Sequence, residues 1–587
     1  MRQIESYLSI SLLSNLTYNT ALMHHFRIIF STILLFFIAN ISYAVNKPPR
    51  VTAAYQRPPV TKETLLGKVE PFCPKTVKPE WRKQQQIENI DIAPSPVCDP
   101  DNPYTIAAFV KGTNNVSMAT MMNTQLSPDT LIKTNDIDGD GDPDEIHIRL
   151  EVIELNGFSP DLKNPINTFN IAPGIQPGFW VFAPKSRGMS TESFASIKAN
   201  HLLRLPSPSI RVEQGDKVII TLENSHYFPH SIHLHGVDHP FQKTNGEGND
   251  GVPQTSNKLI MPGKQFSYEV TPRQPGTMMY HCHVQAHTHI LMGLIGMFIV
   301  EENRPNNWVQ TFNIGDGFVR HSSVAVKEKY SQEYDLQYQD IDKDLHNLIQ
   351  TANDSRLLAK AINREYNITK RTPEYFILNG RSFPYTLRES LIVVKPEEKV
   401  KLRVFNAGDQ QLALHIHGFK PTATHFDGVE LKPKARIQRD VFTLGPAQRV
   451  DLEMYAHNDG LNNMGAGIWT FHDHNELGVT TDGIYPGGNI SSVVFESFLG
   501  PNGMPKLQGV DVSPFFTKDF YQKKYPIWTM SDDMNLYGEI NPQVNLANES
   551  PEALSMDKTQ IAILVIQIIL LIATLMLIRK SAKKTND

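Results

Sequence analysis

The sequence is poor in cysteine and has no excess of basic charge. Only three cysteines, Cys73, Cys98 and Cys282, occur among 587 residues. That number is too small for a disulfide-rich scaffold or a cysteine-rich zinc ribbon. The 56 lysines and arginines are outnumbered by 61 aspartates and glutamates, which gives a formal net charge of −5. Because nucleic-acid-binding proteins rely on a basic surface, this composition argues against a nucleic-acid partner.

Long helical periodicity is also scarce in the central part of the chain. Short apolar segments such as 145–155, 209–222 and 390–405 are separated by Gly, Pro and Asn, a pattern that predicts strands. Residues 303–370 differ, with charge runs and a helix-like patch, and we interpret them as a linker. The pattern predicts an all-β protein of two antiparallel, Greek-key β-sandwiches.

An apolar segment near the N-terminus resembles a secretory signal. Residues 28–41 are almost wholly apolar, follow Arg27, and precede the small-residue cleavage site at 42–44. The preceding residues do not fit a signal, so we interpret Met23 as the true start. The alternative is an uncleaved N-terminal anchor. Export to an oxidising compartment would allow Cys73 and Cys98 to form a disulfide.

A second apolar segment lies near the C-terminus. At about 1.5 Å per residue, the helix expected for residues 561–578 nearly crosses a hydrocarbon core of about 30 Å. Arg579, Lys580 and two further lysines follow, which predicts a cytoplasmic tail. We therefore expect a protein on the periplasmic or extracellular face of a membrane, anchored by a single C-terminal helix.

The two predicted β-bodies share sequence phrases. The first contains IRVEQGDKVIITLEN followed by IHLHG, and the second contains LIVVKPEEKVKLRVFN followed by LHIHG. Such self-similarity is typical of an internal duplication.

Histidines are concentrated in these bodies, where four His-x-His pairs stand out among the 21 histidines of the chain. Residues two apart on a strand share a face, so each pair presents two imidazoles in one direction. Clustered imidazoles suit copper, zinc or iron. The pairs are His233 with His235, His281 with His283, His415 with His417, and His472 with His474.

Alternation along the strands predicts a second group of ligands. Cys282 points away from its flanking histidines, and His230 has the opposite parity to the pair that follows it, so the two can face one another. His287 and Met292 lie just beyond Cys282. A thiolate, two imidazoles and a distant thioether form the ligand set of a blue-copper site. His289 is a rival to His287, which the spacing favours.

These motifs resemble those of the multicopper oxidases, the laccase-like family of cupredoxin repeats. HSIHLHG (230–236) and HCHVQAHTHILM (281–292) resemble one half of the family's copper signatures. LHIHG (414–418) and WTFHDHNELGVTTDGIY (469–485) resemble the other half. The resemblance covers roughly residues 100–500 and implies two cupredoxin-like domains with four coppers per chain.

The resemblance assigns the copper ligands by position. The type 1 ligands would be His230, Cys282, His287 and Met292. The type 2 ligands would be His233 and His415. The type 3 ligands would be His235, His281, His283, His417, His472 and His474.

The second body departs from the type 1 pattern. Leu412, Asp473 and Gly478 stand where the family's histidine, cysteine and second histidine would be. The type 1 site therefore lies in the first of two domains. Two-domain relatives are homotrimers with copper clusters at subunit interfaces, so the resemblance implies a homotrimer. The alternative is a monomer that closes the cluster between its own domains.

The domain layout follows from these segments. We divide the chain into a signal segment (1–44), an N-terminal extension (45–102), cupredoxin domain 1 with the type 1 copper (103–302), a linker (303–370), cupredoxin domain 2 (371–500), a C-terminal extension (501–558), a transmembrane helix (559–580) and a cytoplasmic tail (581–587).

The resemblance implies an oxidase that takes single electrons from a donor and reduces O₂ to water. Candidate donors are Cu(I), Fe(II), Mn(II) or a phenol. Cys282 is joined through the backbone to His281 and His283, which offers electrons a short covalent route. Asp427 and Asp482 are candidates for proton relay, with Asp250 as a third; each could instead be a turn residue before glycine. The alternatives are a copper nitrite reductase-like enzyme and a non-enzymatic copper-binding protein.

A separate acidic segment suggests a calcium site. Asp136, Asp138, Asp140 and Asp144 alternate around glycines, as in loops that bind calcium. The twelfth position is His147 rather than the bidentate glutamate of an EF-hand. A solvated acidic turn is the alternative interpretation.

Overall fold

The computed structural model describes the central part of the chain. Its described residues are 127, 129–140, 142–157, 169–186, 204–304, 309, 311–319, 330–351, 354–501, 503–509 and 511–522, with the backbone of β1 (Gln85–Ile87), β2 (Ile90–Ile92) and β3 (Phe109–Val110). All of them belong to one compact unit that begins at Thr52. The predicted signal, Cys73, Cys98 and the apolar segment 561–578 lie outside these residues. Every helix in the described part is too short or too polar to cross a membrane.

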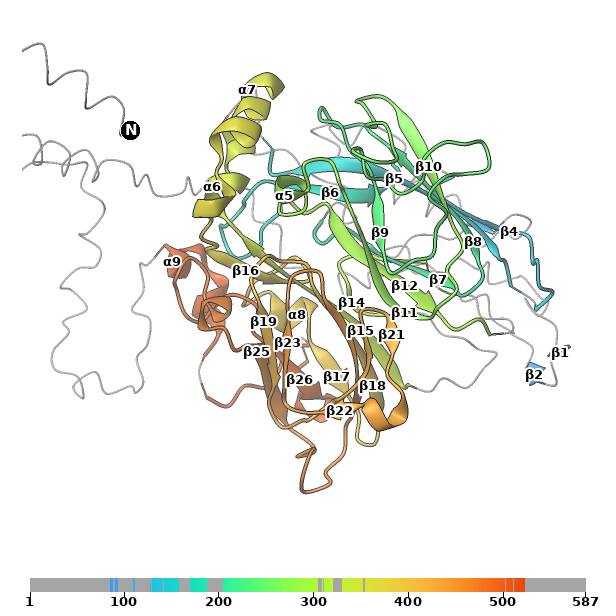
Figure 1. Cartoon of the computed structure of the whole chain (residues 1–587). Coiled ribbons are helices and arrows are strands. Elements are labelled where there is room, and N and C mark those ends of the chain that lie inside the picture. Colours follow the sequence, from blue (N-terminus) through green and yellow to red (C-terminus); the bar gives the residue numbers. More distant parts are fainter. Residues whose placement is uncertain are drawn as a thin grey trace, which may run out of the picture. The chain divides into compact units, whose positions relative to one another are not determined.

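The first β-sandwich is built from two sheets (Figure 1). One has the order β10-β8-β5-β4-β3 with β6 beside β5, and the other has the order β13-β7-β12-β11-β9. The strands of the first sheet are β4 (Leu131–Thr134), β5 (Glu145–Leu155), β6 (Phe179–Pro184), β8 (Lys217–Glu223) and β10 (Gln265–Val270). Those of the second are β7 (Ser209–Glu213), β9 (His233–His235), β11 (Gly276–His281), β12 (Ile295–Glu301) and β13 (Phe312–Asn313).

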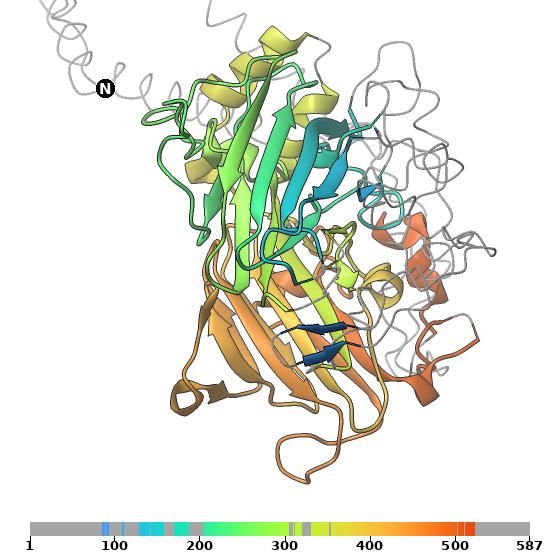
Figure 2. The same cartoon turned by 90° about the vertical axis from the view of Figure 1, so that its right-hand side faces the viewer.

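The second β-sandwich also has two sheets (Figure 2). One follows the order β14-β15-β18-β24-β20-β21, with β16 beside β15 and β22 beside β20, and the other follows β17-β26-β25-β19-β23. The first comprises β14 (Gly317–Phe318), β15 (Gln332–Ile341), β16 (Tyr375–Leu378), β18 (Lys399–Asn406), β20 (Thr422–Phe426), β21 (Val429–Glu430), β22 (Ile437–Gln438) and β24 (Arg449–Tyr455). The second comprises β17 (Ile392–Val394), β19 (Leu412–Ile416), β23 (Val441–Leu444), β25 (Ile468–Asp473) and β26 (Ser491–Phe495).

The two sandwiches repeat one topology. The order β7-β12-β11-β9 recurs as β17-β26-β25-β19, and in both the first pair is parallel and the next two are antiparallel. Likewise β10-β8-β5 recurs as β24-β18-β15, an antiparallel pair followed by a parallel pair. The internal duplication predicted from the shared phrases is therefore present in the strand order.

Short helices occupy the connections. They are α5 (Ala286–His289), α6 (Lys343–His346), η2 (Leu348–Gln350), α7 (Ser355–Lys360), η3 (Ala361–Glu365), η4 (Ile368–Lys370), α8 (Thr386–Glu389), η5 (Pro433–Ala435), η6 (Glu476–Val479), η7 (Glu496–Phe498), η8 (Ser513–Phe516) and α9 (Lys518–Tyr521). The helix-like patch expected within 303–370 corresponds to α6 through η3. Leu345, Ile349, Leu358 and Ile362 join the core of the first sandwich, so these helices cover that body.

The stretch expected to be a linker also contains β15, which the structure makes a strand of the second sandwich. Its sequence QEYDLQYQDI lacks a clean apolar alternation because its buried side chains are largely polar. Asp335 pairs with Arg211, and the Gln337 and Gln339 amides donate to backbone carbonyls. These bonds remove the cost of burying polar groups, so a strand forms where the hydrophobic pattern indicates a loop.

Buried ion pairs and an apolar cluster connect the two sandwiches. Arg211 of β7 donates to Asp335 of β15 at 2.6 Å, and Arg403 of β18 donates to Glu301 of β12 at 2.9 Å. Both guanidinium groups are almost fully buried. Beside them, Met279 and Met297 of the first sandwich lie in one hydrophobic cluster with Phe405 of the second. Removing one partner of such a buried pair would leave an uncompensated charge, so these contacts fix how the sheets meet.

Candidate metal centre

A buried cluster of one thiol and two imidazoles lies where β11 ends. Cys282 follows the last residue of β11, and its Sγ lies 3.6 Å from Nδ1 of His230 and 3.5 Å from Nδ1 of His289. The exposed fraction of each side chain is at most 2%. Burial raises the pKa of the Cys282 thiol to about 12 and lowers the pKa of His289 to about 3. The imidazoles are therefore neutral at physiological pH, the form in which histidine binds a metal.

The structure brings His289, the rival considered from the sequence, rather than His287 into this cluster. After Cys282 the chain turns through Gln285, which has a left-handed φ of 47°, and then forms the single helical turn α5. In that turn His289 faces inward and is buried, whereas the His287 side chain is exposed. Met292 is fully buried in the hydrophobic cluster that contains Cys282, as expected for the predicted axial position.

The sequence interpretation missed His226, which contacts the far side of His230. Nδ1 of His226 lies 2.9 Å from Nε2 of His230, and its own Nε2 lies 3.7 Å from a carboxylate oxygen of Glu154. With Nδ1 of His230 directed at the thiol, its Nε2–H donates to His226. Such outer hydrogen bonds fix the tautomer and orientation of a metal-binding histidine. The only sequence signal was a spacing of four residues in HYFPH.

The first histidine tetrad consists of His233 and His235 on β9 with His281 and His283 at the end of β11. His233 pairs with His281 in the strand register, and Nε2 of His235 lies 2.9 Å from Nε2 of His281. Nδ1–H of His233 donates to the carbonyl of Asp250, and Nδ1–H of His281 donates to the carbonyl of Cys282. These bonds leave both Nε2 atoms available to bind a metal.

Two further observations fit the first tetrad to a metal. Burial lowers the pKa of His281 to about 3 and that of His235 to about 4, so both rings are neutral ligands at pH 7. Nδ1 of His283 is buried and has no hydrogen-bond partner among the described residues. A buried nitrogen without a partner is costly unless a ligand such as a metal ion satisfies it.

The second histidine tetrad consists of His415 and His417 at the end of β19 with His472 and His474 at the end of β25. His415 pairs with His472 in the strand register, and Nε2 of His417 lies 3.3 Å from Nε2 of His472. Nδ1–H of His472 donates to the carbonyl of Asp473, as His281 does to Cys282 in the first tetrad. The duplicated strands therefore carry two equivalent sets of four imidazoles.

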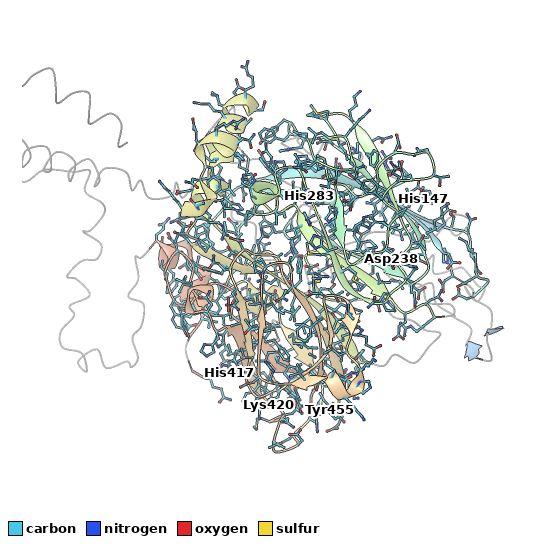
Figure 3. All side chains as sticks on the ribbon, in the orientation of Figure 1. His147, Asp238, His283, His417, Lys420 and Tyr455 are labelled. Atoms are coloured by element: carbon cyan, nitrogen blue, oxygen red, sulfur yellow. The ribbon has the colours of Figure 1, made fainter. Side chains whose placement is uncertain are left out.

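The two tetrads do not meet within one chain. Ring contacts join the histidines of the first tetrad to one another, and those of the second likewise, but among the described residues none joins the two sets. Figure 3 labels His283 of the first tetrad and His417 of the second, which lie apart. His417 and His474 are exposed, so the second set of imidazoles faces outward.

The second sandwich has no counterpart of the thiol cluster among its described residues. Asp473, which replaces the cysteine, is buried and accepts hydrogen bonds from the backbone N–H groups of Ala413 and Asn475. A Cβ at Gly478 would lie only 2.6 Å from a carboxylate oxygen of Asp473, so a histidine does not fit there. The expected loss of a type 1 site in this body thus has a structural cause.

The structure separates the three carboxylates considered for proton transfer. Asp250 lies beside the first tetrad: its carboxylate is 3.3 Å from Nδ1 of His233 and 3.0 Å from Nε2 of His239. His239 was not considered in the sequence interpretation, although it follows IHLHG closely. Asp427 accepts a hydrogen bond from the backbone N–H of Arg449 at 3.0 Å. Burial lowers the pKa of His235 and outweighs the negative charge of Asp427, which raises that pKa.

Asp482, the remaining candidate, lies on a turn next to α6. It forms an ion pair with Lys343 at 2.6 Å and follows the turn at Thr481, which bridges to Tyr375. None of its described contacts is a histidine of either tetrad. Within one chain the DGIY turn points to the α6 side of the sandwich, and a role of Asp482 in proton relay stays a prediction.

Comparison with known proteins agrees with the site. Two family models described as multicopper oxidase match residues 197–305 and 358–483. Ceruloplasmin of Rattus norvegicus is 26% identical over 289 residues, which cover 45% of this chain and 24% of ceruloplasmin. Multicopper oxidase MmcO of Mycobacterium tuberculosis is 24% identical over 258 residues, which cover 43% of this chain and 46% of that protein. The solved structure titled "Multicopper Oxidase mgLAC" is 23% identical, with a TM-score of 0.44 over 65% of this chain and 96% of that one.

The two matched ranges fall within the two β-sandwiches, so each half of the duplicated fold resembles the multicopper oxidase family. The match of this chain spans about a quarter of the length of ceruloplasmin and less than half of MmcO.

Proposed function

We propose that the protein is a multicopper oxidase that oxidises a small reducing substrate and passes the electrons to O₂. The observation that carries this proposal is the arrangement around Cys282. Its buried thiol faces two imidazoles at 3.5–3.6 Å, and its two sequence neighbours are histidines of the first tetrad. A soft thiolate with neutral imidazoles suits copper, and four further pairs of imidazole nitrogens suit additional copper ions.

The residues present fit four coppers per chain. His230, Cys282, His289 and Met292 would hold the type 1 ion, and the two tetrads together would hold the other three. Bound copper supplies one-electron redox chemistry, and four electrons with four protons convert one O₂ to two waters. The donor is proposed to be a metal ion such as Cu(I), Fe(II) or Mn(II), or a phenol.

The protein itself provides connection, orientation and protons. The peptide backbone joins Cys282 directly to His281 and His283, so the two copper sites share a covalent link. Backbone carbonyls hold the imidazoles of His233 and His281 with Nε2 free. Asp250, bonded to both His233 and His239, is placed to move protons at the first tetrad, and Asp427 is the second candidate.

The separation of the tetrads supports an assembly of several chains. Eight imidazoles can surround one group of coppers only if the first tetrad of one chain meets the second tetrad of another. We propose a homotrimer in which each copper cluster lies between neighbouring subunits. A closed ring of head-to-tail contacts has this property, because every subunit contributes one of each surface.

The proposed location is the outer face of a membrane. The support is the signal-like segment 28–41 and the apolar segment 561–578 with its basic flank.

The test of the function is copper content measured together with absorption and O₂ uptake on the purified full-length chain. We expect about four coppers per chain, a strong visible band from the thiolate and a near-ultraviolet shoulder from a coupled pair. Oxidation of a donor should consume O₂ without releasing peroxide. Two coppers with nitrite reduction would instead indicate the nitrite reductase-like alternative, and copper binding without turnover of any donor would indicate a non-enzymatic protein.

Replacing His289 and His287 separately should distinguish the type 1 ligand. We expect His289→Ala to lose the visible band and to lower kcat/KM by at least about 10-fold, since even outer partners of a metal site are worth that much. His287→Ala is the matched control in the same helical turn, and its exposed side chain predicts an unchanged band. The reverse pattern in the absorption spectra would reject the assignment of His289.

A further inference from the structure

The acidic loop between β4 and β5 is already folded around its own carboxylates. One oxygen of Asp136 accepts from the N–H groups of Gly139 and Asp140 at 2.6 and 3.0 Å. An oxygen of Asp144 accepts from the N–H groups of Ile137 and Asp138. One carboxylate oxygen from each of Asp136, Asp138 and Asp144 lies within 4.8 Å of the others.

The structure adds a distant aspartate to this loop. The parallel strands β5 and β8 begin in register at Glu145 and Lys217, so the residues just before them, Asp144 and Asp216, lie side by side. The backbone N–H of Lys217 donates to the carbonyl of Asp144 at 2.7 Å, which joins the two segments. Asp216 belongs to the turn between β7 and β8 and could not be associated with the loop from the sequence.

The carboxylates of this cluster are buried. The exposed fractions of Asp140, Asp142, Asp144 and Asp216 are 6%, 4%, 5% and 3%. Burial, together with the charges of Asp142 and Asp138, raises the pKa of Asp140 to about 8, and burial raises the pKa of Asp216 to about 7. Several buried carboxylates are costly without a compensating cation.

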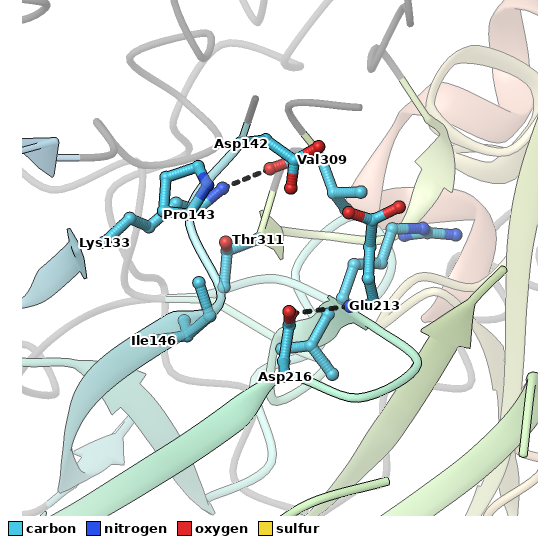
Figure 4. Close-up of a pocket in the computed structure, with 10 residues that line it drawn as sticks. Lys133, Asp142, Pro143, Ile146, Glu213, Asp216, Val309 and Thr311 are labelled. Carbon is cyan, nitrogen blue, oxygen red and sulfur yellow. Dashed lines mark hydrogen bonds between the residues drawn. The ribbon is translucent and has the colours of Figure 1, made fainter. Parts of the chain in front are cut away.

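Asp216 presents an oxygen that no group satisfies. Its Oδ2 accepts from the backbone N–H of Glu213 at 2.7 Å, whereas its buried Oδ1 has no hydrogen-bond partner among the described residues. Asp216 and Asp142 line the same small cavity, of about 10 Å³, next to Pro143 (Figure 4). This is about the volume needed for one water molecule or ion.

The neighbouring basic groups do not neutralise the cluster. Lys133 also lines the cavity, but its ammonium donates to the carbonyl of Val309, and it is a single charge beside the buried Asp140, Asp144 and Asp216. Arg211 is held by Asp335 and Glu333 of the second sandwich. The acidic loop and the β7–β8 turn therefore share an excess of negative charge.

We propose that the acidic loop (136–144) and Asp216 form a binding site for a hard divalent cation of the Ca²⁺ class, separate from the copper sites. Ca²⁺ accepts six to eight oxygen ligands in irregular arrangements, which suits a loop of several aspartates. Mg²⁺ demands a near-ideal octahedron and gives up its waters reluctantly. The bound cation would join the β4–β5 loop to the β7–β8 turn and stabilise the first sandwich.

The test is calcium binding to the full-length protein after treatment with EGTA and removal of the chelator. Copper content is measured before and after, so that a loss of copper is not mistaken for a calcium effect. We expect saturable binding of one Ca²⁺ per chain in calorimetry. At about 100 times the dissociation constant, Tm should rise by about 5 °C or more. Mg²⁺ at the same ionic strength should give a much smaller rise.

Three variants connect the binding to these residues. Asp144→Asn and Asp216→Asn keep the side-chain shape and should each weaken Ca²⁺ binding at least about 10-fold. Glu430→Gln removes an exposed carboxylate elsewhere on the chain and should bind like the wild type. Absence of Ca²⁺ heat and of a Tm shift in the wild-type protein would overturn the proposal. Equal shifts with Mg²⁺ and Ca²⁺, or unchanged binding in Asp216→Asn, would do the same.

Discussion

Replacing Cys282 with serine is expected to abolish the visible thiolate band and to lower kcat/KM for donor oxidation by at least about 100-fold. Loss of an outer partner of a metal site already costs about 10–100-fold, and this change removes the sulfur ligand itself. Cys282 also provides the covalent link to His281 and His283. The measurements are absorption spectra and O₂ uptake over a range of donor concentrations, which gives kcat/KM.

The Cys282→Ser variant should still fold and still bind copper at the tetrads. Serine is nearly isosteric, and His230 and His289 lie close enough to accept a hydrogen bond from its hydroxyl. We therefore expect about three coppers per chain in place of four and a Tm close to that of the wild type. A variant that kept full O₂ uptake would show that electrons reach the tetrads by a route other than Cys282.

Strand alternation explains why much of the site could be predicted from sequence. On β9 and β11 side chains alternate between faces, so the parity of His230 and Cys282 was enough to place them together. The same rule placed His233, His235 and His281 on one side, and the structure brings them together. The repeated sequence phrases likewise indicated the repeated strand order, because two similar sequence segments adopt the same topology.

Loops and single helical turns limited what the sequence could predict. The choice between His287 and His289 depended on α5, a turn of four residues that begins after the left-handed Gln285. No periodicity can be recognised over so short a segment. For the same reason only the fold shows that the turn of Asp482 contacts Lys343. Asp216 was missed because its proximity to Asp144 arises from strand register rather than from spacing in the chain.

Complementation between two inactive variants can test whether one chain or two neighbouring chains build each copper cluster. We expect two inactive variants to restore activity when they are co-expressed. One variant carries His233→Ala and His235→Ala in the first tetrad, and the other carries His415→Ala and His417→Ala in the second. Each variant alone lacks two of the eight imidazoles in every cluster, whether the cluster forms within a chain or between chains.

The mixture distinguishes these two arrangements. If each cluster combines the first tetrad of one chain with the second tetrad of its neighbour, random assembly leaves about one cluster in four with both tetrads intact. Doubly tagged trimers contain both variants, so one of their three clusters has both tetrads intact, and their activity should recover to about a third of the wild-type value. If each cluster closed within one chain, the mixture would stay inactive, because no chain would carry both intact tetrads.

A matched pair of variants controls for nonspecific rescue. Co-expression of His233→Ala/His235→Ala with His281→Ala/His283→Ala damages the first tetrad of every chain, so no assembly contains an intact cluster. Activity in this control would point to exchange of damaged chains or to residual copper binding. Recovery only in the first mixture, in oligomers shown by light scattering to contain three chains, would establish that the exposed second tetrad completes the site of a neighbouring subunit. The outward position of His417 and His474 would then be explained, since these imidazoles face a partner's first tetrad rather than solvent.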